Sequence, residues 1–201
     1  HHNGLRISAA DKRSIIQYLA DTRGLAPAEA APWRYLLEQD TNRVEAVADE
    51  FVQMCARCHS GARFGLQRRS VDEWRLLVHS HIAQTPTLEL QAMSRDRPWL
   101  KLALEETAPQ LAAAFPLESD AWRDWQKATK PELAGQWRLV GFVPGKGAFD
   151  ARMTATGSNA EGYALKLEGR YLDGRPLAGS GTARVFTGYE WRGTLEVDGV
   201  P

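Results

Sequence analysis

The two cysteines of this 201-residue chain lie in one short stretch, Cys55-Ala56-Arg57-Cys58-His59. The spacing C-x-x-C followed at once by histidine is the attachment motif of a c-type haem. Each thiol can form a thioether with a vinyl group of the porphyrin, and the histidine then lies where it can ligate the iron. The motif therefore predicts a covalently bound haem, with Cys55 and Cys58 as attachment residues and His59 as the proximal iron ligand.

Two other interpretations of the C-x-x-C spacing are weaker. A thioredoxin-like redox dithiol requires a βαβ context, which the sequence around the motif lacks. Half of a structural zinc site requires two further ligands at matching spacing. The sequence contains no second C-x-x-C and no H-x-x-x-H. A haem is the favoured interpretation.

The overall charge bears on whether the chain binds nucleic acid or an anionic membrane. With 25 acidic and 25 basic residues, the chain has a formal net charge of zero. This balance argues against nucleic acid or an anionic membrane surface as a partner. No apolar run reaches the length of a membrane span. At 43% hydrophobic residues, the chain can bury a core and form one or two domains.

Helical patterns fill the sequence before and after the motif. Ser8 is predicted to cap a helix that ends at Gly24, which resembles the last helix of a cytochrome c lobe. A second helix is predicted from Thr41 or Asn42 to Met54. Its apolar positions fall on one helical face and are Val44, Val47, Ala48, Phe51 and Val52. A helix that leads directly into C-x-x-C-H is typical of cytochrome c and supports the haem independently. A further helix is predicted from Ser119 to Lys127.

The helix after the motif supplies a candidate for the second axial ligand. Ser70 and Glu73 match the capping box S-x-x-E, which predicts a helix start. This helix carries His79 and His81, which face different ways at about 100° per residue. His81 shares an apolar stripe with Trp74, Leu77 and Val78, whereas His79 faces the charged side. Because a haem needs its sixth ligand from an apolar wall, His81 is the predicted distal ligand.

Several alternatives stay open at this point. Met93 is a rival distal ligand, because methionine is the usual partner of histidine in electron-carrying cytochromes c. The sixth position is open in another alternative, and His81 is then a buried core histidine. His1 and His2 are either near a haem of the preceding lobe or part of a loop or tag. Arginines that can pair with haem propionates are Arg63, Arg68, Arg69, Arg95 and Arg97.

From Glu132 onward the pattern changes to short alternating strands separated by glycine-rich turns. The predicted strands are Trp137–Val143, Ala148–Ala155, Tyr163–Tyr171, Leu177–Val185 and Gly188–Val197. They predict an antiparallel meander that is an incomplete part of a small barrel or sandwich. The region lacks cysteine and histidine, so we expect a structural or docking role.

The predicted fold class is therefore α+β and multidomain, with an all-α cytochrome c-like domain followed by an antiparallel β barrel or sandwich domain. Residues 1–30 are expected to form the C-terminal part of a first cytochrome c lobe. Residues 31–130 are expected to form a second lobe with its own c-type haem. Residues 131–201 are expected to form the incomplete β domain. The sequence as a whole is interpreted as an excerpt of a longer chain.

Over nearly its whole length, the chain resembles the alpha subunit of quinohemoprotein amine dehydrogenase. The attachment motif is common to c-type cytochromes, but the ordered set of segments followed by a β domain is specific. The segments that carry the resemblance are Cys55-Ala56-Arg57-Cys58-His59-Ser60-Gly61-Ala62-Arg63, Glu73-Trp74 through His81 to Pro86, Arg95-Asp96-Arg97, Pro116-Leu117-Glu118-Ser119 with its tryptophans, and Gly188-Tyr189-Glu190-Trp191-Arg192-Gly193.

The resemblance implies a periplasmic enzyme of three subunits that oxidises primary amines to aldehydes. In this family the amine reacts at a cysteine tryptophylquinone in the small gamma subunit, beside a β-propeller beta subunit. The alpha subunit carries two c-type haems and several β domains. Electrons pass from the quinone through the haems to a small blue-copper protein or cytochrome c. The amine chemistry is thus expected outside this chain, which has no catalytic residue of its own.

Residue by residue, the resemblance places Cys55, Cys58 and His59 at the attachment site of the second haem. It implies that His81 is the distal ligand, which gives bis-histidine coordination. The departure from the family pattern is the missing first C-x-x-C-H, which is expected to lie upstream. The alternative function is a haem c enzyme or sensor with an open distal site, fused to a β binding domain.

Overall fold

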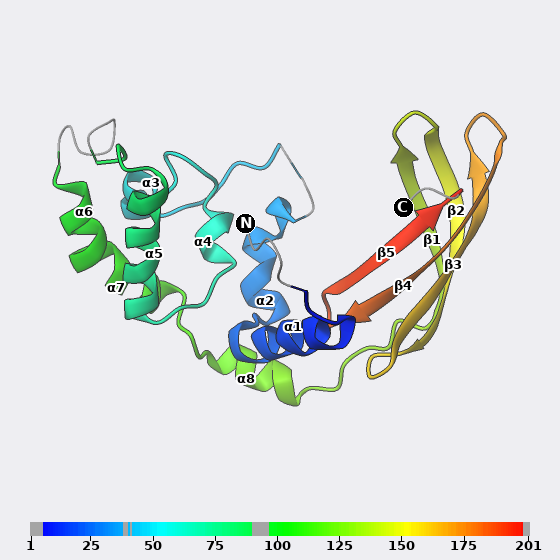
Figure 1. Cartoon of the computed structure of the whole chain (residues 1–201), viewed down its shortest axis with the longest axis horizontal. Coiled ribbons are helices and arrows are strands. Elements are labelled where there is room, and N and C mark those ends of the chain that lie inside the picture. The colour runs from blue at the N-terminus through cyan, green and yellow to red at the C-terminus, as the bar shows by residue number, and fades with distance from the viewer. Residues whose placement is uncertain (1–5, 38–39, 41, 90–96, 199–201) are drawn as a thin grey trace. The chain divides into compact units, whose positions relative to one another are not determined.

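The computed structural model describes residues 6–37, 40, 42–89 and 97–198. The chain divides into two compact units (Figure 1). One unit is Thr22–Ala128 and is helical. The other combines His1–Asp21 with Thr129–Pro201, so that it contains most of helix α1 (Ala9–Arg23) and a β-sheet. The predicted division at residues 30 and 130 stays a prediction.

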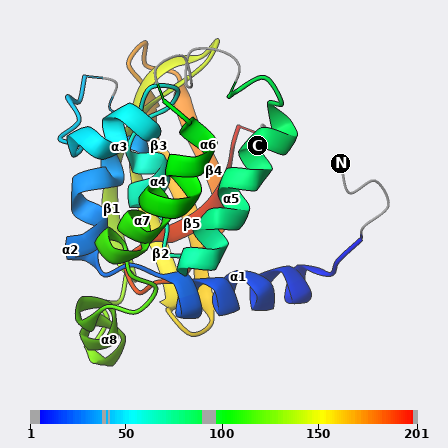
Figure 2. The ribbon, with the colours of Figure 1, turned by 90° about the vertical axis from the view of Figure 1, so that its left-hand side faces the viewer.

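Short helices make up the unit Thr22–Ala128. In chain order they are α2 (Pro27–Ala30), the 3-10 helix η1 (Ala31–Leu36), α3 (Asp49–Met54), α4 (Ala62–Gly65), α5 (Val71–Gln84), α6 (Trp99–Leu102), the π-helical turn η2 (Ala103–Thr107), α7 (Ala108–Ala114) and α8 (Asp120–Lys127). The segments α6, η2 and α7 follow one another without a break. Figure 2 shows α5, α6 and α7 side by side.

Local hydrogen bonds explain why three predicted helices begin where they do. The Asp11 N–H donates to Ser8 Oγ over 3.0 Å at the start of α1. At α5 the capping box is complete, since Glu73 N–H donates to Ser70 Oγ and Ser70 N–H donates to Glu73 Oε2. At α8 the Ser119 side chain accepts a hydrogen bond from the Trp122 N–H. These bonds satisfy N–H groups that a helix cannot pair internally, and the three predictions are confirmed.

The predicted helix from Thr41 or Asn42 to Met54 is wrong over its first half, because only Asp49–Met54 is helical. Thr41 lies outside the described residues. The Glu45 carboxylate accepts bonds from Tyr35 Oη at 2.5 Å and from the Gly61 N–H at 2.8 Å. These contacts are distant in sequence and hold the segment in a non-helical conformation, so tertiary structure overrides the local periodicity.

Two apolar clusters meet at the start of the attachment motif. The larger contains Phe51, Phe64 and Phe115, and the Phe51 and Phe64 ring centroids are 5.6 Å apart. The smaller contains Met54, Trp99 and Ala103. Cys55 packs against both clusters. The backbone that carries the motif is therefore anchored by the core of this unit.

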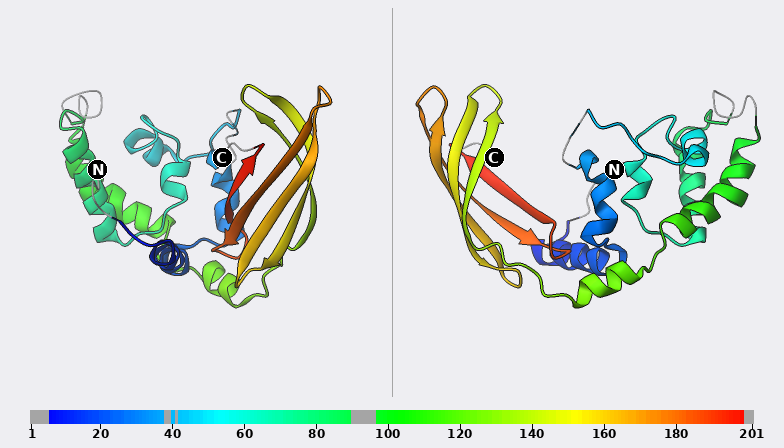
Figure 3. Two further views of the ribbon diagram at one scale, coloured as in Figure 1. Left: turned by 45° about the vertical axis from the view of Figure 1, so that its right-hand side comes forward. Right: turned by 180° about the vertical axis from the view of Figure 1, so that it is seen from behind.

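The sheet is a five-stranded antiparallel meander in the order β1-β2-β3-β4-β5. Its strands are β1 (Gly135–Val143), β2 (Gly147–Ser158), β3 (Gly162–Tyr171), β4 (Pro176–Val185) and β5 (Trp191–Val197). The sheet curls into a half-barrel (Figure 3). The α+β class, with a helical region followed by an antiparallel β domain, is confirmed. The last strand begins at Trp191 and not at Gly188, because Gly188 has a φ of 86° within a turn.

One face of the sheet carries the core of its unit. In β2 and β3, and more weakly in β4, buried residues alternate with more exposed ones, as a sheet with one covered face requires. The buried set includes Met153, Leu167 and Tyr171. Helix α1 buries none of its residues, and its Gln17 Nε2 donates to the Phe186 carbonyl over 3.2 Å.

Candidate haem-binding site

A cavity of about 290 Å³ lies in the helical unit, and all the predicted site residues line it. Cys55, Cys58 and His59 come from the segment after α3, and His81 comes from α5. Helix α5 and the α6–η2–α7 segment supply most of the remaining wall, which is largely apolar. Residues far apart in sequence are thus brought to one cavity.

The imidazole rings of His59 and His81 lie close together, and both residues line this cavity. Their ring centroids are 6.4 Å apart and their planes are inclined by 43°. His59 Nδ1 lies 3.0 Å from the Ser60 carbonyl oxygen, and His81 Nδ1 lies 2.8 Å from the Leu77 carbonyl oxygen. A carbonyl can only accept, so both Nδ1 atoms carry the proton. Each Nε2 therefore keeps its lone pair for a metal.

This geometry fits a haem iron between the two rings. Two metal–nitrogen bonds of about 2.0 Å, each extended by the roughly 1.1 Å from nitrogen to ring centre, put the centres about 6.2 Å apart. The observed separation of 6.4 Å agrees with that sum. Orientation of each ligand by a backbone carbonyl is the usual arrangement around metal-bound histidine.

Burial makes Cys55 a poor candidate for the nucleophile of a redox dithiol. Cys55 and Cys58 are both free, the first half-buried and the second exposed. Burial raises the pKa of the Cys55 thiol to about 11. Redox-active cysteines need the opposite shift, toward the thiolate. Among the described residues, no group of three or more histidine, cysteine or acidic side chains could hold a zinc ion.

Of the other histidine and methionine candidates, the structure describes only His79. His79 is exposed on α5 and is not among the lining residues. Met93, Arg95, His1 and His2 lie outside the described residues.

The candidate propionate partners have different surroundings. Arg63 lines the cavity. The Arg69 guanidinium lies 5.7 Å from the ring centroid of Trp74. Arg68 is buried in an ion pair with a carboxylate 3.3 Å away, and Arg97 Nη1 donates to a carbonyl over 3.4 Å. Among the described arginines, Arg63 and Arg69 are therefore the better candidates to pair with a haem propionate.

One wall of the site was not predicted from the sequence. Trp99, Ala103, Thr107 and Leu111 all line the cavity from the α6–η2–α7 segment. Their spacing of four residues was visible in the sequence. A regular α-helix rotates such a row by about 40° per step, and the wider π-helical turn at Ala103–Thr107 reduces that rotation. The four-residue spacing was thus present in the sequence, but the π-helical turn that brings these residues to one cavity could not be predicted from it.

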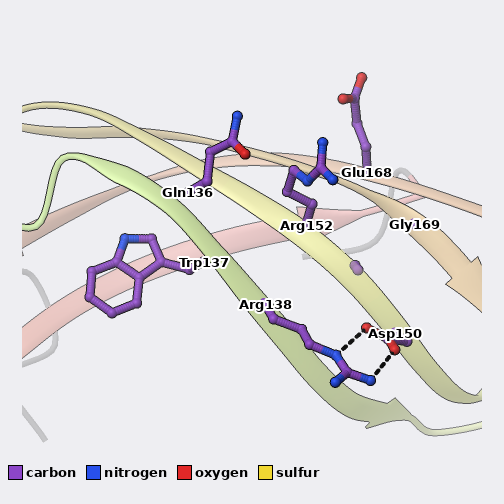
Figure 4. Close-up of a pocket in the computed structure, with 8 residues that line it drawn as sticks. Gln136, Trp137, Arg138, Asp150, Arg152, Glu168 and Gly169 are labelled. Carbon is purple, nitrogen blue, oxygen red and sulfur yellow. Dashed lines mark hydrogen bonds and ion pairs between the residues drawn. The ribbon is translucent and has the colours of Figure 1, made fainter.

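A second hollow lies on strands β1, β2 and β3 (Figure 4). Arg138 donates to both carboxylate oxygens of Asp150, over 3.0 and 2.6 Å. This pairing lowers the pKa of the Asp150 carboxyl. The residues that line the hollow include neither histidine nor cysteine, and the charges are matched to each other.

Comparison with known proteins supplies the deciding observation. Residues 1–122 match the family model described as quinohemoprotein amine dehydrogenase A, alpha subunit, haem binding. Residues 130–201 match the model for domain II of the same alpha subunit. The chain belongs to this family. The resemblance inferred from the sequence is confirmed, and the helical region is the haem-binding region of a quinohemoprotein amine dehydrogenase alpha subunit.

Family membership makes the chain part of a multi-subunit amine dehydrogenase, an oxidoreductase. The comparison of this chain with curated proteins found no match. In the described part of the chain, no helix has both the length and the apolar character needed to cross a membrane.

Proposed function

We propose that this chain transfers electrons within the amine dehydrogenase, by means of haem c attached at Cys55 and Cys58 and ligated by His59 and His81. When bound, the haem supplies one-electron redox chemistry. The chain's own residues hold and orient the haem, exclude water through the apolar wall, and set the reduction potential through ligand identity and burial.

The observation that carries this proposal is the pair of neighbouring histidine rings that line one cavity. Their centroid separation of 6.4 Å suits two ligands on one iron, and both Nδ1 atoms are engaged with carbonyls. Two histidine ligands would leave no position on the iron for a substrate. This arrangement suits an electron carrier better than an enzyme that binds its substrate at iron.

The wider role rests on family membership. We propose that the amine reacts at a cysteine tryptophylquinone in a partner subunit, beside a β-propeller subunit. Electrons then pass through this chain to a small blue-copper protein or cytochrome c. We further propose a second haem c attached upstream of residue 1 and a periplasmic location. The β unit would have a structural or docking role in that assembly.

The test is substitution of the distal histidine in the haem-loaded protein. His81→Ala should convert a low-spin haem to high-spin, as followed by absorption and EPR spectra. His79→Ala is the matched control, since His79 lies on the same helix but, unlike His81, does not line the cavity. The control should keep the low-spin spectrum. An unchanged spectrum in His81→Ala would refute ligation by His81.

The unmutated protein separates the remaining alternatives. Binding of cyanide or carbon monoxide at iron would indicate an open distal site and a haem enzyme or sensor. A sulfur-to-iron charge-transfer band would instead indicate Met93 as the ligand. Neither result is expected if His81 occupies the sixth position.

A further inference from the structure

The indole N–H of Trp74 is a buried donor that the described protein atoms leave unpaired. Trp74 is 2% exposed, and its Nε1 has no hydrogen-bond partner in the described part of the chain. Buried polar groups in proteins nearly always have a partner, because an unmet hydrogen bond is costly. Trp74 also lines the haem cavity. The missing acceptor is therefore expected on the group that fills the cavity.

Trp99 shows that an orphan donor is not a general feature of this wall. It lines the same cavity and is also buried, at 6% exposure. Its Nε1 donates to the Met54 carbonyl oxygen over 3.1 Å. One cavity tryptophan thus has an acceptor within the protein, and the other has none among the described residues.

The surroundings of Trp74 favour an anionic acceptor. The Arg69 guanidinium lies 5.7 Å from the centroid of the Trp74 ring. Arg69 Nε in turn donates to Gln67 Oε1 over 2.8 Å. Gln67 and Arg63 line the same cavity. Arg69 and Gln67 thus bring positive charge and polar groups close to Trp74, while other lining residues, such as Met54 and Leu88, are apolar.

The position of Trp74 on α5 points to the edge of the bound group. Trp74 precedes His81 by seven residues, which is two helical turns and about 10 Å along the axis on nearly the same face. An acceptor that reaches Trp74 therefore belongs to the periphery of the group whose iron His81 ligates. The anionic peripheral groups of a haem are its two propionates.

We infer that the Trp74 indole N–H donates a hydrogen bond to a haem propionate, so that the propionate edge of the haem faces Arg63, Gln67 and Arg69. This inference rests on the proposed function, since it requires haem in the cavity. Trp74 is then a positioning residue. It orients the porphyrin about the axis through His59 and His81 and balances part of the propionate charge in a low-dielectric wall.

The experiment compares Trp74→Phe with Trp99→Phe in the haem-loaded protein. Both changes keep an aromatic ring and remove one N–H. Resonance Raman spectra report hydrogen bonding at the propionates through their bending bands, and potentiometry gives the reduction potential. Trp74→Phe should shift a propionate band and lower the potential, with the equilibrium constant for haem reduction falling roughly threefold. Trp99→Phe should leave the propionate bands unmoved.

A second measurement tests the same hydrogen bond without a substitution, in case Trp74→Phe does not fold. Labelling with 5-fluorotryptophan makes the indole a stronger donor, so the same band should shift in the opposite direction. Unmoved propionate bands in both Trp74→Phe and the labelled protein would overturn the inference, as would equal shifts in the two phenylalanine variants. If covalent haem or ligation by His81 is itself missing, it is the proposed function that fails, and this is seen in the absorption spectrum before any comparison of variants.

Discussion

The buried ion pair between Glu29 and Arg68 connects α2 to the segment after the attachment motif. Arg68 Nη2 lies 3.3 Å from Glu29 Oε1, and the side chains are 5% and 15% exposed for Arg68 and Glu29. Glu29 Oε2 also accepts the Ala26 N–H over 2.8 Å. Arg68 Nη1 donates to the carbonyls of Gly65 and Gln67 over 3.2 and 3.0 Å. Each partner is thus held by several bonds.

Removal of the Glu29 carboxylate should lower the unfolding free energy by much more than the intact ion pair contributes to it. Glu29→Ala leaves the Arg68 guanidinium buried without its counter-charge, which costs about 3–5 kcal/mol of unfolding free energy. Glu29→Gln keeps an acceptor and loses only the charge, so we expect about 1–3 kcal/mol. A typical domain has about 5–15 kcal/mol in total. Glu29→Ala therefore removes a large share of the stability.

Equilibrium unfolding of the haem-loaded protein in urea, followed by far-UV circular dichroism, measures these differences. The control is Glu105→Gln in the same helical unit. Glu105 lies 4.0 Å from Lys101, and these side chains are 63% and 67% exposed. An exposed pair of this kind contributes about 0.5 kcal/mol or less and weakens in salt. The loss in Glu29→Ala should persist when salt is raised.

A loss below about 1 kcal/mol in Glu29→Ala, with an unchanged dependence of the unfolding free energy on urea, would contradict a buried and unpaired Arg68. Such a result would mean that Arg68 reaches water or another partner without its carboxylate. It would also return Arg68 to the set of arginines available to the haem propionates.

Two further predictions concern residues beside the site. The hydrogen bond from Arg23 and the Ser70 N–H lower the pKa of Glu73 from 4.5 to about 2. Because these side chains are about one-third exposed, the pair contributes about 1 kcal/mol. This stability is present above pH 4.5 and is lost as pH falls through about 2. Glu73→Gln retains a capping box. In denaturant titrations, this change should lower the unfolding free energy at pH 7 and leave it unchanged at pH 2. An equal loss at the two pH values would contradict the assignment. Gly65→Ala should cost about 1–3 kcal/mol in the same assay, because a Cβ at Gly65 would overlap the Trp33 indole. A neutral Gly65→Ala would show that this ring can move aside.

Much of the fold could be predicted because its causes are local. The capping box at Ser70 and Glu73 spans three residues, and both of its bonds are present. The strand alternation has a period of two, and each predicted strand matches one strand of the meander, apart from the start of β5 at Trp191. Interactions between neighbours in sequence can be recognised without knowing the tertiary fold.

The error before α3 has the opposite cause. The apolar spacing of residues 44–52 is helical, yet Val44 is 87% exposed and helix α3 begins only at Asp49. Glu45 is held by Tyr35 and Gly61, ten and sixteen residues away. Periodicity reports which face could be buried, but it contains no information about partners at that distance.

The expected chemistry of the site follows from the sequence, since Cys55, Cys58 and His59 form one short motif whose spacing predicts haem attachment. Helical periodicity also predicts which face of α5 carries His81. The tertiary fold places this residue near His59, with the ring centroids 6.4 Å apart. The packing of α5 beside α7 and η2 also leaves the Trp74 N–H buried without an acceptor among the described residues. The reason is that axial ligation and burial depend on distances between helices, and these follow from how the side chains of the core pack.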